Sequence, residues 1–313
     1  MTDDIARVEA GRQLGHDLYC HSRLARDPGW SEAVTEGFDS AEARGQMRQA
    51  GDRFVRKWLQ LRASALRRDR IVDADVTPDF LRRLDVAECP VLRIRLTHGE
   101  QSDTDWSVDR LNNDGAYAPR NLAIISTRVN CAKADFDFAA VHARACGQVP
   151  ARDLAPAQWM RLAVLMLGPC HAEQPSAAPV LPLLAPLPNL TARPANQMIQ
   201  YVLTMHTQVA AERNLVVKQF NRCCLDSHAR AHCRQLAEHI HFALKETPVC
   251  WDVWLLPRVM QTFLAWRTSV PDRHWAAIGA EAMVLAGGQR VERSALAGWH
   301  LASRGHFGNS WRR

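Results

Sequence analysis

Residues 105–133, DWSVDRLNNDGAYAPRNLAIISTRVNCAK, hold many of the side chains of this 313-residue chain that could take part in chemistry. Among them are the carboxylate of Asp109, the amides of Asn121 and Asn130, and the cations of Arg110 and Lys133. Carboxylate and amide oxygens are hard ligands of the kind that Mg²⁺ or Mn²⁺ prefers. A guanidinium is suited to bidentate binding of phosphate.

The sequence around these side chains predicts the elements that must position them. Residues 91–96 and 106–111 alternate between apolar and polar side chains, as strands do. The segment 112–115, NNDG, favours a turn because Asn, Asp and Gly tolerate positive φ. Residues 121–126 would form the returning strand, and 127–134 a helix capped by Ser126 or Thr127. The stretch from 106 onwards therefore predicts a ββα unit.

Helical spacing dominates the rest of the chain. It appears over 4–24 and 40–70, where Met47 and Trp58 share an apolar stripe, and after Pro194 it continues to about residue 302. We predict a mainly α protein with a small ββα insertion and a helical C-terminal domain. The expected parts are an N-terminal helical region (1–88), the ββα module with the helix that follows it (89–150), a helix (151–171), a Pro-rich linker (172–196) and the C-terminal domain (197–313).

Composition limits the class of protein only mildly. The net charge of +6 fits an anionic partner without requiring one. The start of the chain lacks a secretory h-region, and the most apolar run, 249–266, contains Asp252, Pro257 and Arg258. Nine cysteines, an odd number, suggest reduced thiols. We therefore expect a cytoplasmic protein that does not enter a membrane.

A basic segment precedes the ββα stretch. Between residues 41 and 70 the chain has nine Arg or Lys residues and three acidic residues. Arg53, Arg56 and Arg67 point away from the apolar stripe of the expected helix. This pattern is typical of a solvated outer face, and it also suits a helix that contacts phosphates.

The stretch SVDRLNNDGAYAPRNLAIISTRVNCAK resembles the HNH, or His-Me finger, endonuclease family over about residues 89–138. The residues that carry the resemblance are Ser107, Asp109, Arg110, Gly115, Tyr117, Pro119, Asn121, Asn130 and Lys133. The resemblance implies that Asp109 and Asn130 bind one divalent metal, most simply Mg²⁺ or Mn²⁺. It further implies that Asn121 holds the catalytic base or braces the loop, and that Lys133 approaches the phosphate.

Arg110 departs from the family pattern, because that position normally carries the histidine that deprotonates water. A guanidinium is not deprotonated in proteins and cannot be a general base. Three substitutes are open: His98 could enter the site, a metal-bound hydroxide could attack alone, or Arg110 could clamp the phosphate. Arg120 and Arg128 are further candidates for nucleic-acid contact.

Cysteine and histidine offer two other candidate sites. Cys89 and Cys131 flank the motif, but the chain has no C-x-x-C pair, so buried free thiols explain them better than a structural zinc. His228 and His232 have the i, i+4 spacing of a helical metal pair, without the glutamate of an H-E-x-x-H motif. We expect that helix face to pack against a neighbour.

These observations predict a metal-dependent endonuclease or nicking enzyme that acts on DNA. A catalytically inactive protein of the same fold that binds nucleic acid is the alternative. A helical protein-interaction module is a third possibility, and the C-terminal domain would then bind a protein partner that the sequence does not identify.

Overall fold

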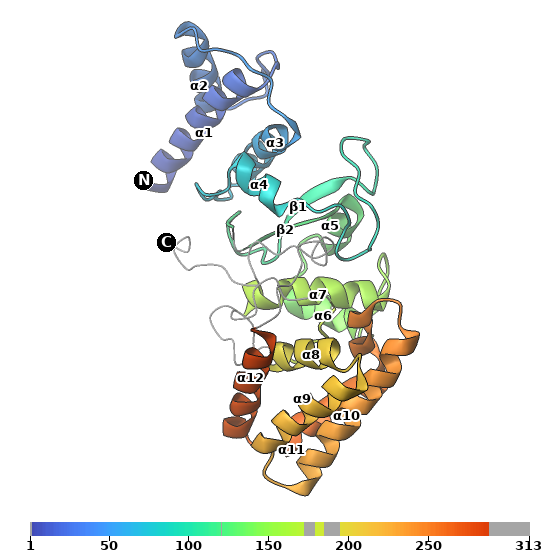
Figure 1. Ribbon diagram of the computed structural model, residues 1–313. Helices are drawn as coiled ribbons and strands as arrows, with labels where there is room; N and C mark the ends of the chain where they lie inside the picture. Colours follow the sequence, from blue (N-terminus) through green and yellow to red (C-terminus); the bar gives the residue numbers. More distant parts are fainter. Residues whose placement is uncertain (1, 120, 172–178, 185–194, 288–313) are drawn as a thin grey trace.

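The computed structural model describes residues 2–119, 121–171, 179–184 and 195–287. These residues are mainly helical, with one two-stranded antiparallel sheet. The molecule in Figure 1 is elongated, with the N-terminal helices at one end, the sheet near the middle and the C-terminal helices at the other end. No described helix combines the length and the apolar character that a membrane span needs.

The first two helices, α1 (Thr2–His21) and α2 (Glu32–Ala43), pack against each other at two glycines. A Cβ atom on Gly15 or on Gly37 would lie 1.9 Å from a backbone oxygen of the other helix. The helices therefore approach so closely that neither position accommodates a side chain.

The prediction of one continuous helix over 40–70 is wrong. A loop follows α2, and α3 (Arg53–Arg67) begins only where Asp52 caps it by accepting hydrogen bonds from backbone N–H groups of its first turn. Gly45 has a φ of 65° just beyond α2, a conformation that ends a helix. Met47, which the periodicity placed on the apolar stripe, is 83% exposed in this loop.

The next segment holds a short helix and corrects a prediction. Helix α4 (Pro78–Leu84) begins with the Thr77 hydroxyl accepting a hydrogen bond from a backbone N–H of its first turn. Residues 91–96, expected as a strand, instead turn back on themselves. Arg93 has a φ of 57°, and its N–H donates to the carbonyl oxygen of Cys89 at 2.7 Å. The segment makes one isolated bridge and no ladder.

The ββα arrangement appears where the sequence predicted it. Strands β1 (Trp106–Arg110) and β2 (Leu122–Ser126) pair antiparallel, with Asp109 opposite Ala123. Helix α5 (Thr127–Lys133) follows directly, and the Ser126 hydroxyl caps it by accepting a hydrogen bond from a backbone N–H of its first turn. One hydrophobic core includes residues from both faces of β2, together with residues of α3, α4 and the next two helices, α6 (Phe138–Ala145) and α7 (Pro156–Cys170).

The C-terminal region is helical, as predicted, over the residues that the structure describes. Its elements are α8 (Ala195–His206), α9 (Ala210–Cys223), α10 (Ser227–Glu246), η3 (Cys250–Leu255), α11 (Pro257–Ser269) and α12 (Asp272–Ala286). They enclose a second core in which Trp254 and Trp266 are fully buried. Most of the expected Pro-rich linker and the part of the predicted helical stretch after residue 287 lie outside the described residues.

One ion-pair cluster joins the region of the sheet to the C-terminal helices. Arg93, at the tip of its turn, donates two hydrogen bonds of 2.5 Å to the two carboxylate oxygens of Asp252 in η3. Arg161 of α7 lies 3.8 Å from the same carboxylate.

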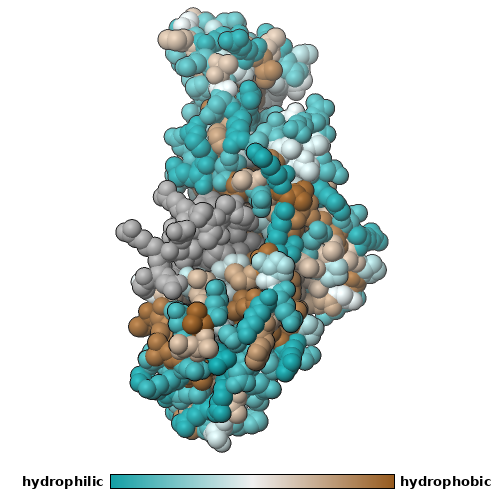
Figure 2. Space-filling view, turned by 45° about the vertical axis from the view of Figure 1, so that its right-hand side comes forward, coloured by the Kyte–Doolittle hydropathy of each residue, from teal (hydrophilic) through white to brown (hydrophobic). Residues whose placement is uncertain are grey.

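On the face shown in Figure 2, hydrophilic residues cover most of the upper part, and the hydrophobic patches gather lower down.

Candidate functional site

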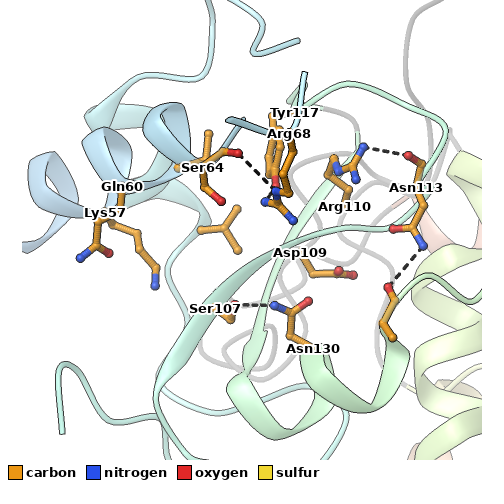
Figure 3. Close-up of a pocket in the computed structure, with 13 residues that line it drawn as sticks. Lys57, Gln60, Ser64, Arg68, Ser107, Asp109, Arg110, Asn113, Tyr117 and Asn130 are labelled. Carbon is orange, nitrogen blue, oxygen red and sulfur yellow. Dashed lines mark hydrogen bonds between the residues drawn. The ribbon is translucent and has the colours of Figure 1, made fainter. Parts of the chain in front are cut away.

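A cleft of about 390 Å³ lies between α3 and the ββα unit (Figure 3). One wall is a single face of α3, since its lining residues recur at helical spacing. The other wall comes from β1, the turn after it and α5. The residues that line the cleft are Lys57, Gln60, Leu61, Ser64, Arg68, Ser107, Val108, Asp109, Arg110, Asn113, Tyr117, Asn130 and Ala134.

Asn121 braces the turn that shapes one end of the cleft. Its side chain is fully buried. The Oδ1 atom accepts a hydrogen bond from the N–H of Asn112 at 2.8 Å. The amide nitrogen donates to the carbonyl oxygens of Asn112 and Ala116 at 2.8 and 3.0 Å. Of the two roles that the resemblance implies for Asn121, this geometry is that of the brace.

Lys133 and Asp109 form a buried pair, in which Asp109 lines the cleft and Lys133 lies behind it. The Lys133 side chain is 0% exposed, and its Nζ atom lies 3.2 Å from Oδ1 of Asp109. The same Nζ donates to the carbonyl oxygen of Arg110 at 2.7 Å and to Oδ1 of Asn113 at 3.1 Å. All three donors of the ammonium thus have oxygen partners.

Asp109 is less completely satisfied than its partner. Its Oδ2 atom is buried and has no hydrogen-bond partner among the described residues. Burial raises the pKa of Asp109, against the opposing charge of Lys133. Asn130, on α5, lines the same cleft, and its amide nitrogen donates to the Ser107 hydroxyl at 2.9 Å.

The pair of residues expected to bind a divalent metal lines the cleft, but its surroundings do not fit a metal. The single carboxylate already contacts a buried ammonium, and a divalent ion beside it would meet that positive charge. Over the described ranges, no group of three or more His, Cys, Asp or Glu side chains could hold an ion.

Arg110 serves both the turn and the cleft. Its Nη1 atom donates to the carbonyl oxygens of Asn113 and Gly115 at 2.7 and 2.9 Å. The guanidinium lies 5.1 Å from the centre of the Tyr117 ring, over its face. Of the three alternatives left open by this arginine, the geometry is compatible with the one in which Arg110 clamps the phosphate.

The α3 side of the cleft adds two more cations. Arg68 donates from Nη2 to the Tyr117 hydroxyl at 2.6 Å, so Tyr117 contacts two arginines. Lys57 donates to the carbonyl oxygen of Trp106 at 3.0 Å, and burial lowers the pKa of its ammonium. The lining thus contains three cations and one carboxylate, and Lys133 already neutralises that carboxylate.

The structure does not bring His98 to the cleft. Its ring packs edge-on against Trp106, with 5.3 Å between the ring centres, and no histidine is among the described residues that line the cleft. Burial, and next the charge of Arg53, lowers the pKa of His98. The expectation that His98 supplies the missing base is therefore not supported by its position.

The arginines expected to contact nucleic acid lie elsewhere. Arg53 forms an ion pair with Asp85, and Arg128 donates to the carbonyl oxygen of Asp153 at 3.1 Å. Arg56 and Arg67 are exposed but outside the cleft lining, and Arg120 lies outside the described residues.

Sequence reasoning missed Lys57 and Arg68, although both belong to the basic segment. The cations chosen from the sequence lie opposite the apolar stripe, whereas Lys57 and Arg68 lie beside it. The signal was the polar row of Lys57, Gln60, Ser64 and Arg68, whose spacing follows one helix face beside that stripe.

Two expectations outside the cleft are wrong in part, because Cys131, expected to be a buried thiol, and His228, on the helix face expected to pack against a neighbour, are both exposed. Cys89 is buried, and its Sγ atom accepts a hydrogen bond from the backbone N–H of Ser126 at 3.4 Å, whereas Cys131 is exposed. The rings of His228 and His232 lie 4.3 Å apart, centre to centre, on α10.

Comparison with known proteins adds no relative from which to argue. No family model, no curated protein and no solved structure matches the chain.

Proposed function

We propose that the cleft between α3 and the ββα unit binds the phosphodiester backbone of a nucleic acid, most simply DNA. The observation that carries the proposal is the convergence of Lys57, Arg68 and Arg110 from two walls onto one cleft. Fixed cations that release counterions from phosphates supply most sequence-independent affinity for nucleic acid. The one carboxylate, Asp109, adds little repulsion because Lys133 neutralises it.

The arginine pair around Tyr117 sets the geometry of binding. Arg68 and Arg110 contact the hydroxyl and the ring face of the same tyrosine, so their guanidinium groups are held close together. Planar guanidinium groups held in this way suit the oxygens of one phosphate or of two successive ones. Tyr117 is 5% exposed and therefore positions cations instead of stacking on bases.

Phosphodiester hydrolysis is the second candidate. It is favoured by the resemblance of the ββα residues to HNH endonucleases and by the presence of Asp109 and Asn130 in the same cleft. Inactive binding ranks first because the described cleft holds no histidine and because Asp109 is already paired.

Binding and nicking assays on matched variants test both candidates. The double variant Lys57→Met/Arg68→Met is compared with Lys218→Met/Arg258→Met, which removes the same charge from exposed C-terminal positions. We expect the cleft variant to bind a fluorescent 20-base-pair duplex at least tenfold more weakly at low salt. Its salt slope should fall by about two, the value for two lost phosphate contacts.

Equal weakening by the two variants would mean that only net charge matters, which would contradict the proposal. Nicking of supercoiled plasmid by wild type, with or without Mg²⁺ or Mn²⁺, that is lost in Asp109→Asn would raise hydrolysis above inactive binding. A protein that neither binds nor nicks would leave the ββα unit a structural element of a helical interaction module.

A further inference from the structure

We propose that the Lys133 ammonium is a built-in cation that fills an oxygen cage otherwise suited to a metal ion, so that the cleft binds phosphate without a divalent metal. The inference concerns the cleft of the proposed function, and it predicts how that cleft responds to metals.

The cage consists of three oxygens of three chemical kinds. They are a carboxylate oxygen of Asp109, the backbone carbonyl oxygen of Arg110 and the amide oxygen of Asn113, at 3.2, 2.7 and 3.1 Å from Nζ. Carboxylate, carbonyl and amide oxygens are the donors that hard divalent cations take from proteins. An ammonium with three N–H donors matches three such oxygens one to one.

The surrounding structure holds the cage in shape independently of Lys133. Asn121 fixes the turn that carries Asn113, through its hydrogen bonds to Asn112 and Ala116. Strand pairing with β2 holds Asp109 and Arg110, which supply the other two oxygens. The cage is therefore preorganised, and removal of the ammonium would leave a buried carboxylate and two carbonyl-type oxygens without a counter-ion.

Charge explains why the ammonium and a divalent ion exclude each other. Lys133 is 0% exposed and sits in direct contact with the one carboxylate, so the pair is neutral overall. A divalent ion on the same carboxylate would be placed within a few ångströms of a buried positive charge, where screening by salt is weak. A fixed lysine thus takes the cation position and makes metal binding there unfavourable.

The test is a titration with Mn²⁺ on the full-length protein, without nucleic acid. The variants are Lys133→Met, which keeps an unbranched chain of similar length, and Lys133→Gln. Lys218→Met is the matched control for charge. Melting temperature and bound Mn²⁺, counted by electron paramagnetic resonance, are measured in EDTA and in Mn²⁺.

Wild type and Lys218→Met should give the same Tm with EDTA and with Mn²⁺. Lys133→Met should melt lower in EDTA and bind one Mn²⁺. At about 100 times the dissociation constant the ion should raise its Tm by about 5 °C. Adding Asp109→Asn to Lys133→Met should abolish that gain.

Stoichiometric Mn²⁺ binding by wild type that depends on Asp109 would overturn the proposal. So would a folded Lys133→Met or Lys133→Gln variant that ignores Mn²⁺, or failure of Mn²⁺ to restore folding to variants that are unfolded in EDTA. Because nucleic acid is left out, these results are independent of whether the cleft binds DNA.

Discussion

The ββα cleft and the C-terminal helical region bury polar groups in opposite ways. In the cleft, the fully buried Asn121 and Lys133 use their side-chain hydrogen-bonding atoms on named partners. In the C-terminal region, Gln197 and Gln200 are also buried, yet three of their side-chain polar atoms lack a hydrogen-bond partner among the described residues. Large tryptophans dominate there instead.

This difference separates specificity of shape from bulk stability. A polar network in which most atoms have partners, Oδ2 of Asp109 being an exception, fixes one arrangement of a turn and its charges, because each broken contact strands another polar group. An apolar core contributes more free energy but constrains individual positions less. The variants below test this division, from the largest expected effect to the smallest.

Trp254→Ala should have the largest effect on stability. The side chain is 0% exposed and its indole N–H donates to the Thr204 hydroxyl at 2.8 Å. We expect a loss of about 3–5 kcal/mol in the free energy of unfolding, measured by urea denaturation. The variant that remains folded should bind duplex DNA as wild type does. Loss of binding at temperatures where it is folded would show that the two regions are coupled.

Asn121→Ala should have the next largest effect. The substitution strands the N–H and carbonyl of Asn112 and the carbonyl of Ala116, at a cost of about 3 kcal/mol in unfolding free energy. Unlike Trp254→Ala, it should also weaken binding of the duplex by the folded protein, because it loosens the turn. Asn214→Ala, at an exposed position of α9, should change neither quantity. A stable Asn121→Ala variant would contradict the role of the brace.

Tyr117→Phe should act on the cleft alone. It removes the hydroxyl that accepts the hydrogen bond from Arg68 and leaves the ring under Arg110. We expect duplex binding to weaken about threefold to tenfold, with a loss of about 1 kcal/mol in stability. The matched change in the other region, Tyr201→Phe, should leave binding unchanged. Equal effects of the two changes on binding would remove the distinction between the regions.

The smallest effect concerns pH and should be shared by both regions. Burial lowers the pKa of His98 beside the sheet and of His239 on α10. A lowered pKa in the folded state means that each neutral imidazole favours folding above pH 6.5, and that this stability is lost as the pH falls through the lower value. His98→Gln and His239→Gln should each reduce slightly the drop in Tm between pH 7.5 and 5. A drop in Tm that is larger in either variant than in wild type would contradict the expected direction of the effect.

Local signals in the sequence were sufficient for the ββα unit and its caps. Ser126 caps α5 as predicted, and Thr77 and Asp137, residue types that favour the N-cap, likewise accept a hydrogen bond from a first-turn N–H of α4 and α6. The alternation of apolar and polar residues at 91–96 predicted a strand wrongly, because apolar residues at alternate positions can also face a core from a turn around Arg93.

The composition of the cleft depended on contacts that no local pattern encodes. Arg53 was expected to meet phosphate, but Asp85, distant in sequence, pairs with it. Lys57 and Arg68 gained their positions from the docking of α3 beside β1. His98 is close to the motif along the chain, but its ring packs on Trp106 and does not line the cleft.

The contact between Arg93 and Asp252 has a mechanical consequence. The turn that carries Arg93 belongs to the region of the sheet, and Asp252 belongs to the C-terminal helices, so this bidentate ion pair links the two regions. Because each side chain keeps about a quarter of its surface exposed, added salt weakens the ion pair. If the cleft binds nucleic acid as proposed, a rise in ionic strength should therefore weaken both this contact between the two regions and that binding.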